Sequence, residues 1–91
     1  MRLSEKEIKI IKNVTTQFLN EAKIYLFGSR LDDSKRGGDI DLFIVSKDMN
    51  YERKLKIRAK LKALLKKPVD VVCHKDFNRV IEKEALKGRL L

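Results

Sequence analysis

Residues 25–45 read YLFGSRLDDSKRGGDIDLFIV, in which a polar, glycine-containing loop joins two apolar runs. The apolar runs predict strands over 23–27 and 39–45, because alternating apolar residues bounded by turn signals are typical of strands. The second run carries carboxylates at alternate positions, Asp39 and Asp41. A strand places residues i and i+2 on one face, about 6.5 Å apart at Cα. We therefore expect both acids to point the same way from an otherwise apolar strand.

Two such carboxylates repel each other and are costly to desolvate, and a divalent cation held by oxygen ligands relieves both problems. A third acid, Asp70, lies in a valine-rich run that predicts a strand over 69–73, where aspartate is unusual. If that strand lies beside Asp41, a strand spacing of about 4.8 Å brings the third carboxylate to the other two. Three converging carboxylates can hold two Mg²⁺ ions about 3.5–4 Å apart. A structural salt bridge is the alternative for Asp39 and Asp41.

Gly28 and Ser29 stand between the first strand and an expected short helical turn. Such a turn offers amide donors, a hydroxyl and the positive end of a helix, which together suit phosphate. Arg30 adds a guanidinium that can contact phosphate. The alternative is an ordinary Gly-Ser turn followed by a surface arginine. Asp32 and Asp33 are interpreted as acids at the start of the turn rather than as ligands.

The remaining segments predict three helices. Ser4 and Glu7 form a capping box for a helix over 5–20. Asp48 or Asn50 caps a long helix that reaches about residue 66, and Pro68 ends it. Its buried side is expected to carry four leucines, at positions 55, 61, 64 and 65. Asp76 is expected to cap a last helix through Leu86, which Gly88 stops.

The alternation of helices and strands predicts an α/β fold with a small mixed β-sheet backed by helices, in a single domain over 1–91. The N-terminus lacks the apolar segment of a signal peptide, and no run approaches the ~20 apolar residues of a membrane span. We expect a cytoplasmic protein without membrane attachment. Cys73 is alone, which excludes an internal disulfide, and it is interpreted as a small buried residue.

The net charge of +9 is unevenly distributed. Residues 51–67 hold eight basic residues and one acid, a net charge of +7, so the rest of the chain carries only +2. A basic helix of this kind favours an anionic partner, a protein or a nucleic acid, and its basic residues include Arg53, Lys54, Arg58 and Lys62. The alternative is a solvated helix face. The scarcity of aromatic residues weakens base stacking but not phosphate contact.

The combination of Gly28-Ser29, Asp39-Ile40-Asp41 and the later Asp70 resembles the DNA polymerase β nucleotidyltransferase superfamily. The short chain is similar to the minimal nucleotidyltransferases, the MNT family, and the resemblance covers about residues 5–91. It implies the nucleotidyltransferase fold, two Mg²⁺ ions and an NTP such as ATP. It also implies that Ser29 binds the terminal phosphates, that Asp39 and Asp41 bridge both metals, and that Asp70 binds the metal that activates the acceptor hydroxyl.

The resemblance further implies an antitoxin that transfers AMP to a tyrosine of a HEPN-domain toxin. We therefore predict a Mg²⁺-dependent nucleotidyltransferase of this kind. The first alternative is a catalytically silent antitoxin that neutralises its partner by binding, although a pure binding module has no need of three clustered acids. The second is a small nucleic-acid-binding module that uses the basic helix over 51–67. The preferred base, the acceptor and any homo-oligomer are left open by the sequence.

Overall fold

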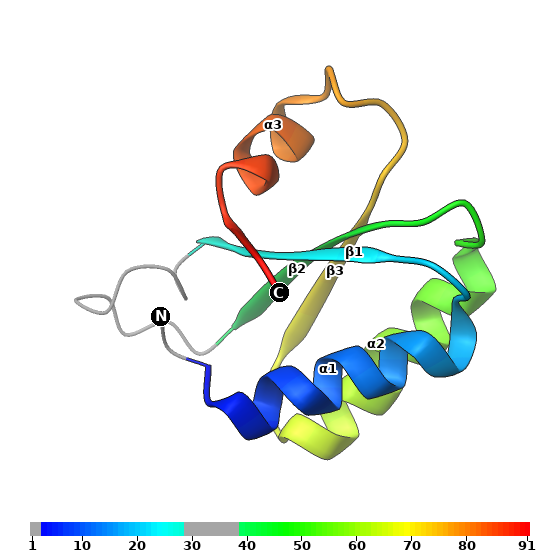
Figure 1. The fold of residues 1–91 in the computed structure, drawn as a ribbon, viewed down its shortest axis with the longest axis vertical. Helices are drawn as coiled ribbons and strands as arrows, with labels where there is room; N and C mark the ends of the chain where they lie inside the picture. Colours follow the sequence, from blue (N-terminus) through cyan, green and yellow to red (C-terminus); the bar gives the residue numbers. More distant parts are fainter. Residues whose placement is uncertain (1–2, 29–38) are drawn as a thin grey trace.

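The computed structural model describes residues 3–28 and 39–91 of the chain. The expected acids Asp32 and Asp33, the glycines 37 and 38, and the candidate phosphate ligands Ser29 and Arg30 lie outside these residues. In chain order the elements are α1 (Glu5–Phe18), β1 (Lys23–Phe27), β2 (Ile40–Val45), α2 (Tyr51–Leu65), β3 (Val69–Cys73), α3 (Val80–Leu86) and β4 (Arg89–Leu90), as Figure 1 shows.

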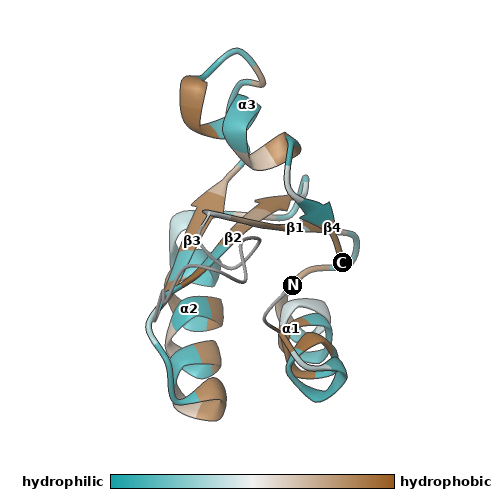
Figure 2. Ribbon diagram, turned by 90° about the vertical axis from the view of Figure 1, so that its left-hand side faces the viewer, coloured by the Kyte–Doolittle hydropathy of each residue, from teal (hydrophilic) through white to brown (hydrophobic). Residues whose placement is uncertain are grey.

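The strands form one sheet in the order β3-β2-β1-β4. β1 pairs antiparallel with β2 and with β4, whereas β2 and β3 run parallel, so the sheet is mixed as expected. α1 and α2 lie side by side against one face, and α3 lies on the other (Figure 2). The predicted α/β fold with a small mixed sheet is therefore confirmed. No helix among the described residues is long and apolar enough to cross a bilayer.

α1 begins as the capping box predicts, because the Ser4 hydroxyl accepts from Glu7 N–H and the Glu7 carboxylate accepts from Ser4 N–H. The helix ends at Phe18, two residues before the predicted end. Leu19 turns to an extended backbone at φ −128° and buries its side chain in the core. Burial of this leucine, worth roughly 1.5–3 kcal/mol, outweighs one more helical residue.

α2 is capped by Asn50, whose side chain accepts from Arg53 N–H. It ends at Leu65, and the next residue, Lys66, adopts a left-handed conformation two residues before Pro68. The predicted buried side was partly wrong, because Leu55 and Leu64 are 42% and 50% exposed. The core row is instead spaced four residues apart and consists of Ile57, Leu61 and Leu65.

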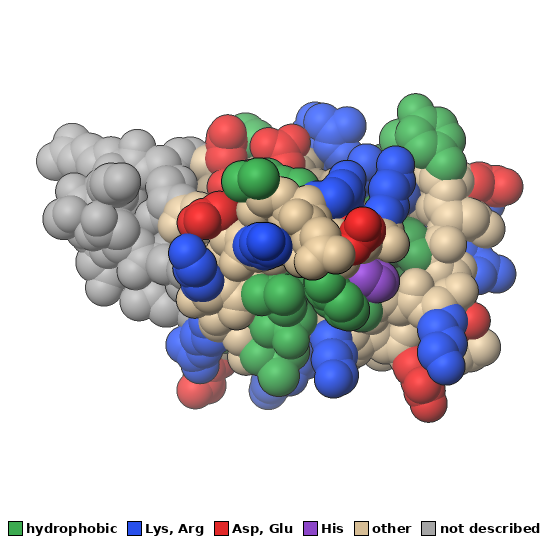
Figure 3. Space-filling model, turned by 90° about the horizontal axis from the view of Figure 1, so that it is seen from above, with side chains coloured by type: hydrophobic (Ala, Val, Ile, Leu, Met, Phe, Trp, Pro, Cys, Tyr) green, Lys and Arg blue, Asp and Glu red, His purple; other side chains and the backbone are tan. Residues whose placement is uncertain are grey.

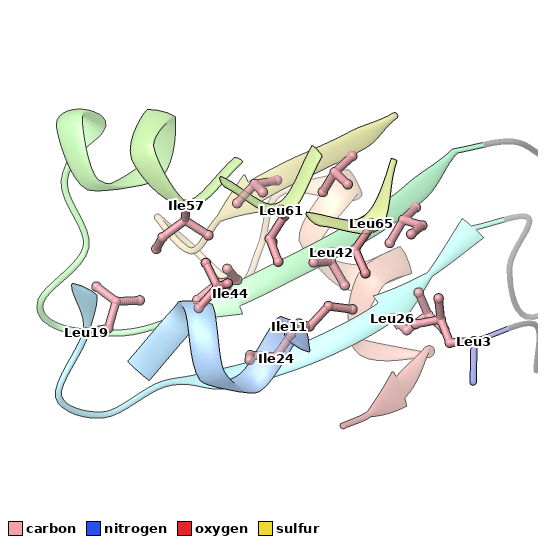
Figure 4. Close-up of a cluster of buried hydrophobic side chains, with 14 residues drawn as sticks. Leu3, Ile11, Leu19, Ile24, Leu26, Leu42, Ile44, Ile57, Leu61 and Leu65 are labelled. Atoms are coloured by element: carbon pink, nitrogen blue, oxygen red, sulfur yellow. The ribbon is translucent and has the colours of Figure 1, made fainter. Parts of the chain in front are cut away.

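The main core fills the space between the sheet and the pair α1 and α2, where fourteen apolar side chains form one cluster (Figure 4). The strand residues that enter it include Ile24, Leu26, Leu42 and Ile44, all of which are buried. Phe43, on the opposite face, is also fully buried and lies against Tyr25 and His74. β2 is buried on both faces along most of its length. An ionised side chain near its start can therefore reach solvent only at that end of the sheet.

The C-terminal segment differs from the prediction in two ways. α3 begins at Val80, not after Asp76, because the Asp76 carboxylate accepts from Asn78 N–H in a turn that precedes the helix. The chain then adds β4, a strand that the sequence did not indicate, which pairs with β1. Gly88 permits this return, since a Cβ there would come closer than 3.0 Å to the Leu26 carbonyl oxygen.

Candidate active site

Two of the three predicted acids are direct neighbours in the sheet. Asp41 on β2 is the register partner of Asp70 on β3. Parallel strands lie about 4.8 Å apart, and register partners point to the same face, so the two carboxylates lie side by side. Asp39 precedes β2 by one residue and is exposed to solvent. The expectation that β3 places Asp70 beside Asp41 is confirmed, while the roles of the three acids in catalysis stay a prediction.

Gly28 lies directly against Asp41. Its neighbour Phe27 is the register partner of Asp41 on the antiparallel side of β2. Gly28 has a φ of 77°, and a Cβ at this position would come closer than 3.0 Å to Oδ2 of Asp41. Only glycine satisfies both conditions without strain. The segment predicted to cradle phosphate therefore starts beside Asp41, and its other two residues, Ser29 and Arg30, lie outside the described residues.

The electrostatics of the site favour a bound cation. Burial raises the pKa of Asp41 above its ordinary value, and the nearby carboxylates of Asp70 and Asp39 raise it further. The negative charge of Asp41 is therefore unfavourable in the folded protein, and a divalent cation beside it would remove the penalty. No three His, Cys, Asp or Glu side chains of residues 3–28 and 39–91 are already gathered into a metal-binding group. The donors nevertheless fit Mg²⁺ in kind, since all are carboxylate oxygens that repel one another.

Arg58 is a component of the site that the sequence analysis assigned only to a basic surface. Its Nε donates to the backbone carbonyl of Val69 at 3.1 Å, and its Nη2 lies 4.0 Å from Oδ1 of Asp70. Both side chains are about half exposed, so the pair adds little to stability. The hydrogen bond to Val69 nevertheless fixes the guanidinium beside Asp70. The signal in the sequence was the spacing of basic residues every four positions along α2, which places one of them over β3.

A second polar cluster, absent from the sequence prediction, joins β3 to α3. The fully buried Glu82 carboxylate lies 2.6 Å from His74 Nδ1 and 2.5 Å from Arg79 Nε. It also accepts the backbone N–H groups of Lys75 and Asp76. Burial opposes ionisation, but these hydrogen bonds outweigh it and lower the pKa of Glu82 to about 2. The ionised Glu82 carboxylate therefore holds the loop before α3 in place through these hydrogen bonds and ion pairs.

The α3 side of the molecule carries apolar side chains among lysines, arginines and acids (Figure 3). His74 stacks on Phe77 with ring centroids 3.9 Å apart. Nearby, a hollow of about 650 Å³ is lined by residues that include Tyr25, Val45, Phe77 and Leu86. None of the three candidate acids lines it, since Val45 marks the end of β2 opposite to Asp41. The hollow is thus separate from the candidate active site.

The family model described as "Polymerase beta, Nucleotidyltransferase" matches residues 8–91. The match includes both acid-bearing strands, Gly28 and the basic helix α2. Among curated proteins, none matches the chain closely enough to count as a relative.

Proposed function

Because the chain belongs to the polymerase β nucleotidyltransferase family, we propose that it transfers AMP from ATP to the hydroxyl of a protein acceptor. The acceptor in this proposal is a tyrosine of a HEPN-domain toxin, and the chain is the antitoxin that silences it. The family supports nucleotidyl transfer in general. The observation that carries the proposal is the pairing of Asp41 with Asp70 directly beside Gly28.

In this proposal Asp39, Asp41 and Asp70 hold two Mg²⁺ ions. When bound, the ions neutralise the charge of the triphosphate and of the departing pyrophosphate. The absence of a side chain at Gly28 lets the nucleotide approach the acids closely, because a Cβ would fill that space. The Ser29 hydroxyl and the Arg30 guanidinium are assigned to the β- and γ-phosphates.

The reaction forms one bond and breaks one. The acceptor oxygen bonds to the α-phosphorus, the bond from that phosphorus to the bridging oxygen of the β-phosphate breaks, and the acceptor proton leaves to water. The products are an AMP ester of the acceptor and pyrophosphate. Positioning and charge neutralisation supply the catalysis, as in other phosphoryl-type transfers.

Two labels of ATP test the proposal. The protein is incubated with Mg²⁺, a HEPN-domain protein as the acceptor and ATP labelled at either the α- or the γ-phosphate. Label from the α-phosphate alone should appear on the partner, and Asp41→Asn or EDTA should abolish it. Transfer of the γ-label would show a kinase, and the absence of any label with an intact complex would favour the silent antitoxin.

A further inference from the structure

α2 has apolar residues on two opposite sides. One row, Ile57, Leu61 and Leu65, is buried against the sheet and α1. A second row, four residues apart on the outer surface, consists of Tyr51, Leu55, Ala59 and Ala63. Tyr51 is 73% exposed and Leu55 is 42% exposed, and both alanines are exposed as well. A solvated helix face needs no uncharged row of this length, because the outer side of a surface helix is normally polar.

Basic residues flank the outer apolar row on both sides. On the side toward β3 lie Lys54, Arg58 and Lys62, again spaced by four. Neither Lys54 nor Lys62 forms an ion pair with a carboxylate of the described residues. On the other side, Lys56 pairs with the only acid of the helix, Glu52, and Lys60 binds Gln17 of α1. The outer face of α2 is thus an apolar stripe between two cationic borders.

We propose that this outer face of α2 binds an amphipathic α-helix of a partner protein, with an apolar stripe flanked by aspartates and glutamates. Charge complementarity to both borders selects the acidic flanks. Ala59 and Ala63 allow two helix axes to approach to about 8 Å, the short end of the usual range. Tyr51 and Leu55 supply the larger apolar contacts, as anchors do in helix-in-groove recognition.

Other occupants fit the same face less well. A second copy of the chain would set one helix of net charge +5 against another, which is strongly repulsive. A nucleic acid would satisfy the basic borders and would find one exposed ring, Tyr51, but Leu55, Ala59 and Ala63 would offer its other bases no stacking. An anionic membrane would accept both the charges and the apolar row. The experiment below therefore distinguishes binding to a membrane from binding to an acidic helix.

One border of this face reaches the edge of the candidate active site. Arg58 belongs to that border and contacts both the Val69 carbonyl and Asp70. Asp41 and Asp70 themselves lie on the other face of the sheet, with Phe43, so a helix docked on α2 would reach them only past the edge of β3. Identifying the docked partner with the acceptor rests on the proposed function. The docking itself does not depend on the proposed function, and it is measured without nucleotide.

The test uses a fluorescent synthetic helix of about five turns, with leucine and alanine in one stripe and glutamate on both flanks. Its affinity for the full chain is measured by fluorescence anisotropy, beside a peptide in which lysine replaces every glutamate. We expect the glutamate peptide to bind at least about tenfold more tightly. Leu55→Glu should weaken it by about tenfold or more. Leu64→Glu, the same change at a similarly exposed leucine of the same helix, should alter it by less than about twofold.

Two further probes separate the other occupants, namely vesicles containing phosphatidylserine and a single-stranded oligonucleotide. The proposal is overturned if the peptides bind equally or not at all, or if Leu55→Glu and Leu64→Glu have the same effect. It is also overturned if Leu55→Glu releases the vesicles while peptide binding is unaffected. If peptide binding holds but no AMP is transferred, the docking surface stands and the proposed activity falls.

Discussion

Asp41→Asn provides a direct measure of the repulsion in the candidate site. The side chain keeps its size and loses its charge, so the Asp70 carboxylate beside it gains a neutral neighbour. Two unit charges about 5 Å apart interact by roughly 0.8 kcal/mol in water and about 3 kcal/mol at a dielectric constant of 20. Asp41 and Asp70 are partly solvated, which places the pair near the lower value. We expect the free energy of unfolding without metal to rise by about 0.5–1 kcal/mol.

Thermal melts in EDTA at neutral pH measure the effect. For a domain of this size, a gain of this order raises Tm by roughly 2–8 °C. The sign follows from the raised pKa of Asp41, because a carboxyl that is harder to ionise when folded costs stability above its ordinary pKa of 3.8. Mg²⁺ with ATP should raise the Tm of the wild type, and Asp41→Asn should remove most of that gain.

Asp48→Asn is the matched control. Its carboxylate accepts the Asn20 N–H at 3.0 Å and lies beyond the opposite end of β2, so neutralisation relieves no repulsion between acids. We expect the Tm of this variant to stay unchanged or to fall. If Asp41→Asn is clearly less stable than the wild type in EDTA, Asp41 is a structural hydrogen-bonding residue and the reasoning from the metal site is refuted.

Three other perturbations follow from the structure. Glu82→Gln should lower the free energy of unfolding by about 1–3 kcal/mol. Because its folded pKa is depressed, wild-type stability should fall as the pH drops from 4.5 to about 2 in acid denaturation, and the variant should lose that dependence. Gly28→Ala should lower the free energy of unfolding in urea by more than about 1 kcal/mol, because φ is positive and the new methyl meets Asp41. When Asp41→Ala is also present, only the part of this loss that comes from the steric clash should be recovered. Arg58→Gln should change Tm by little but increase the rise in Tm with added Mg²⁺, since Asp70 loses a competing cation; a smaller rise would mean that Arg58 instead holds Asp70 in place for the metal.

The sequence predicted the elements that depend on local signals. The capping box of α1, Pro68 after α2 and the apolar strands are all recognised from neighbouring residues, and each lies within a few residues of its expected place. Asp41 and Asp70 could be paired in advance because a short α/β chain leaves few places for a valine-rich strand. Adjacency alone did not determine the register that sets Asp41 opposite Asp70, because two neighbouring strands can pair in several registers.

The parts that the sequence did not predict depend on distant contacts. β4 has only two residues, and it forms because Gly88 can pack on the Leu26 carbonyl. No local sequence pattern predicts this contact. Nothing in the residues around Glu82 distinguishes it from other helix acids, yet the loop before α3 folds back to surround it with donors. Leu55 was assigned to the core because α2 has two apolar rows, and periodicity alone does not distinguish the one that meets the sheet.

Two arginines, Arg58 and Arg79, protect the open edge of β3. Pro68 and His74 bond to β2, so the alternate residues Val69 and Cys73 direct their carbonyls outward. Arg58 takes the first carbonyl and Arg79 the second. At the other edge, β4 is too short to template another strand. A sheet of this size with unguarded edges invites pairing between molecules. Here a foreign strand would first have to displace a guanidinium at each end of β3, which favours a protein that stays dispersed at high concentration.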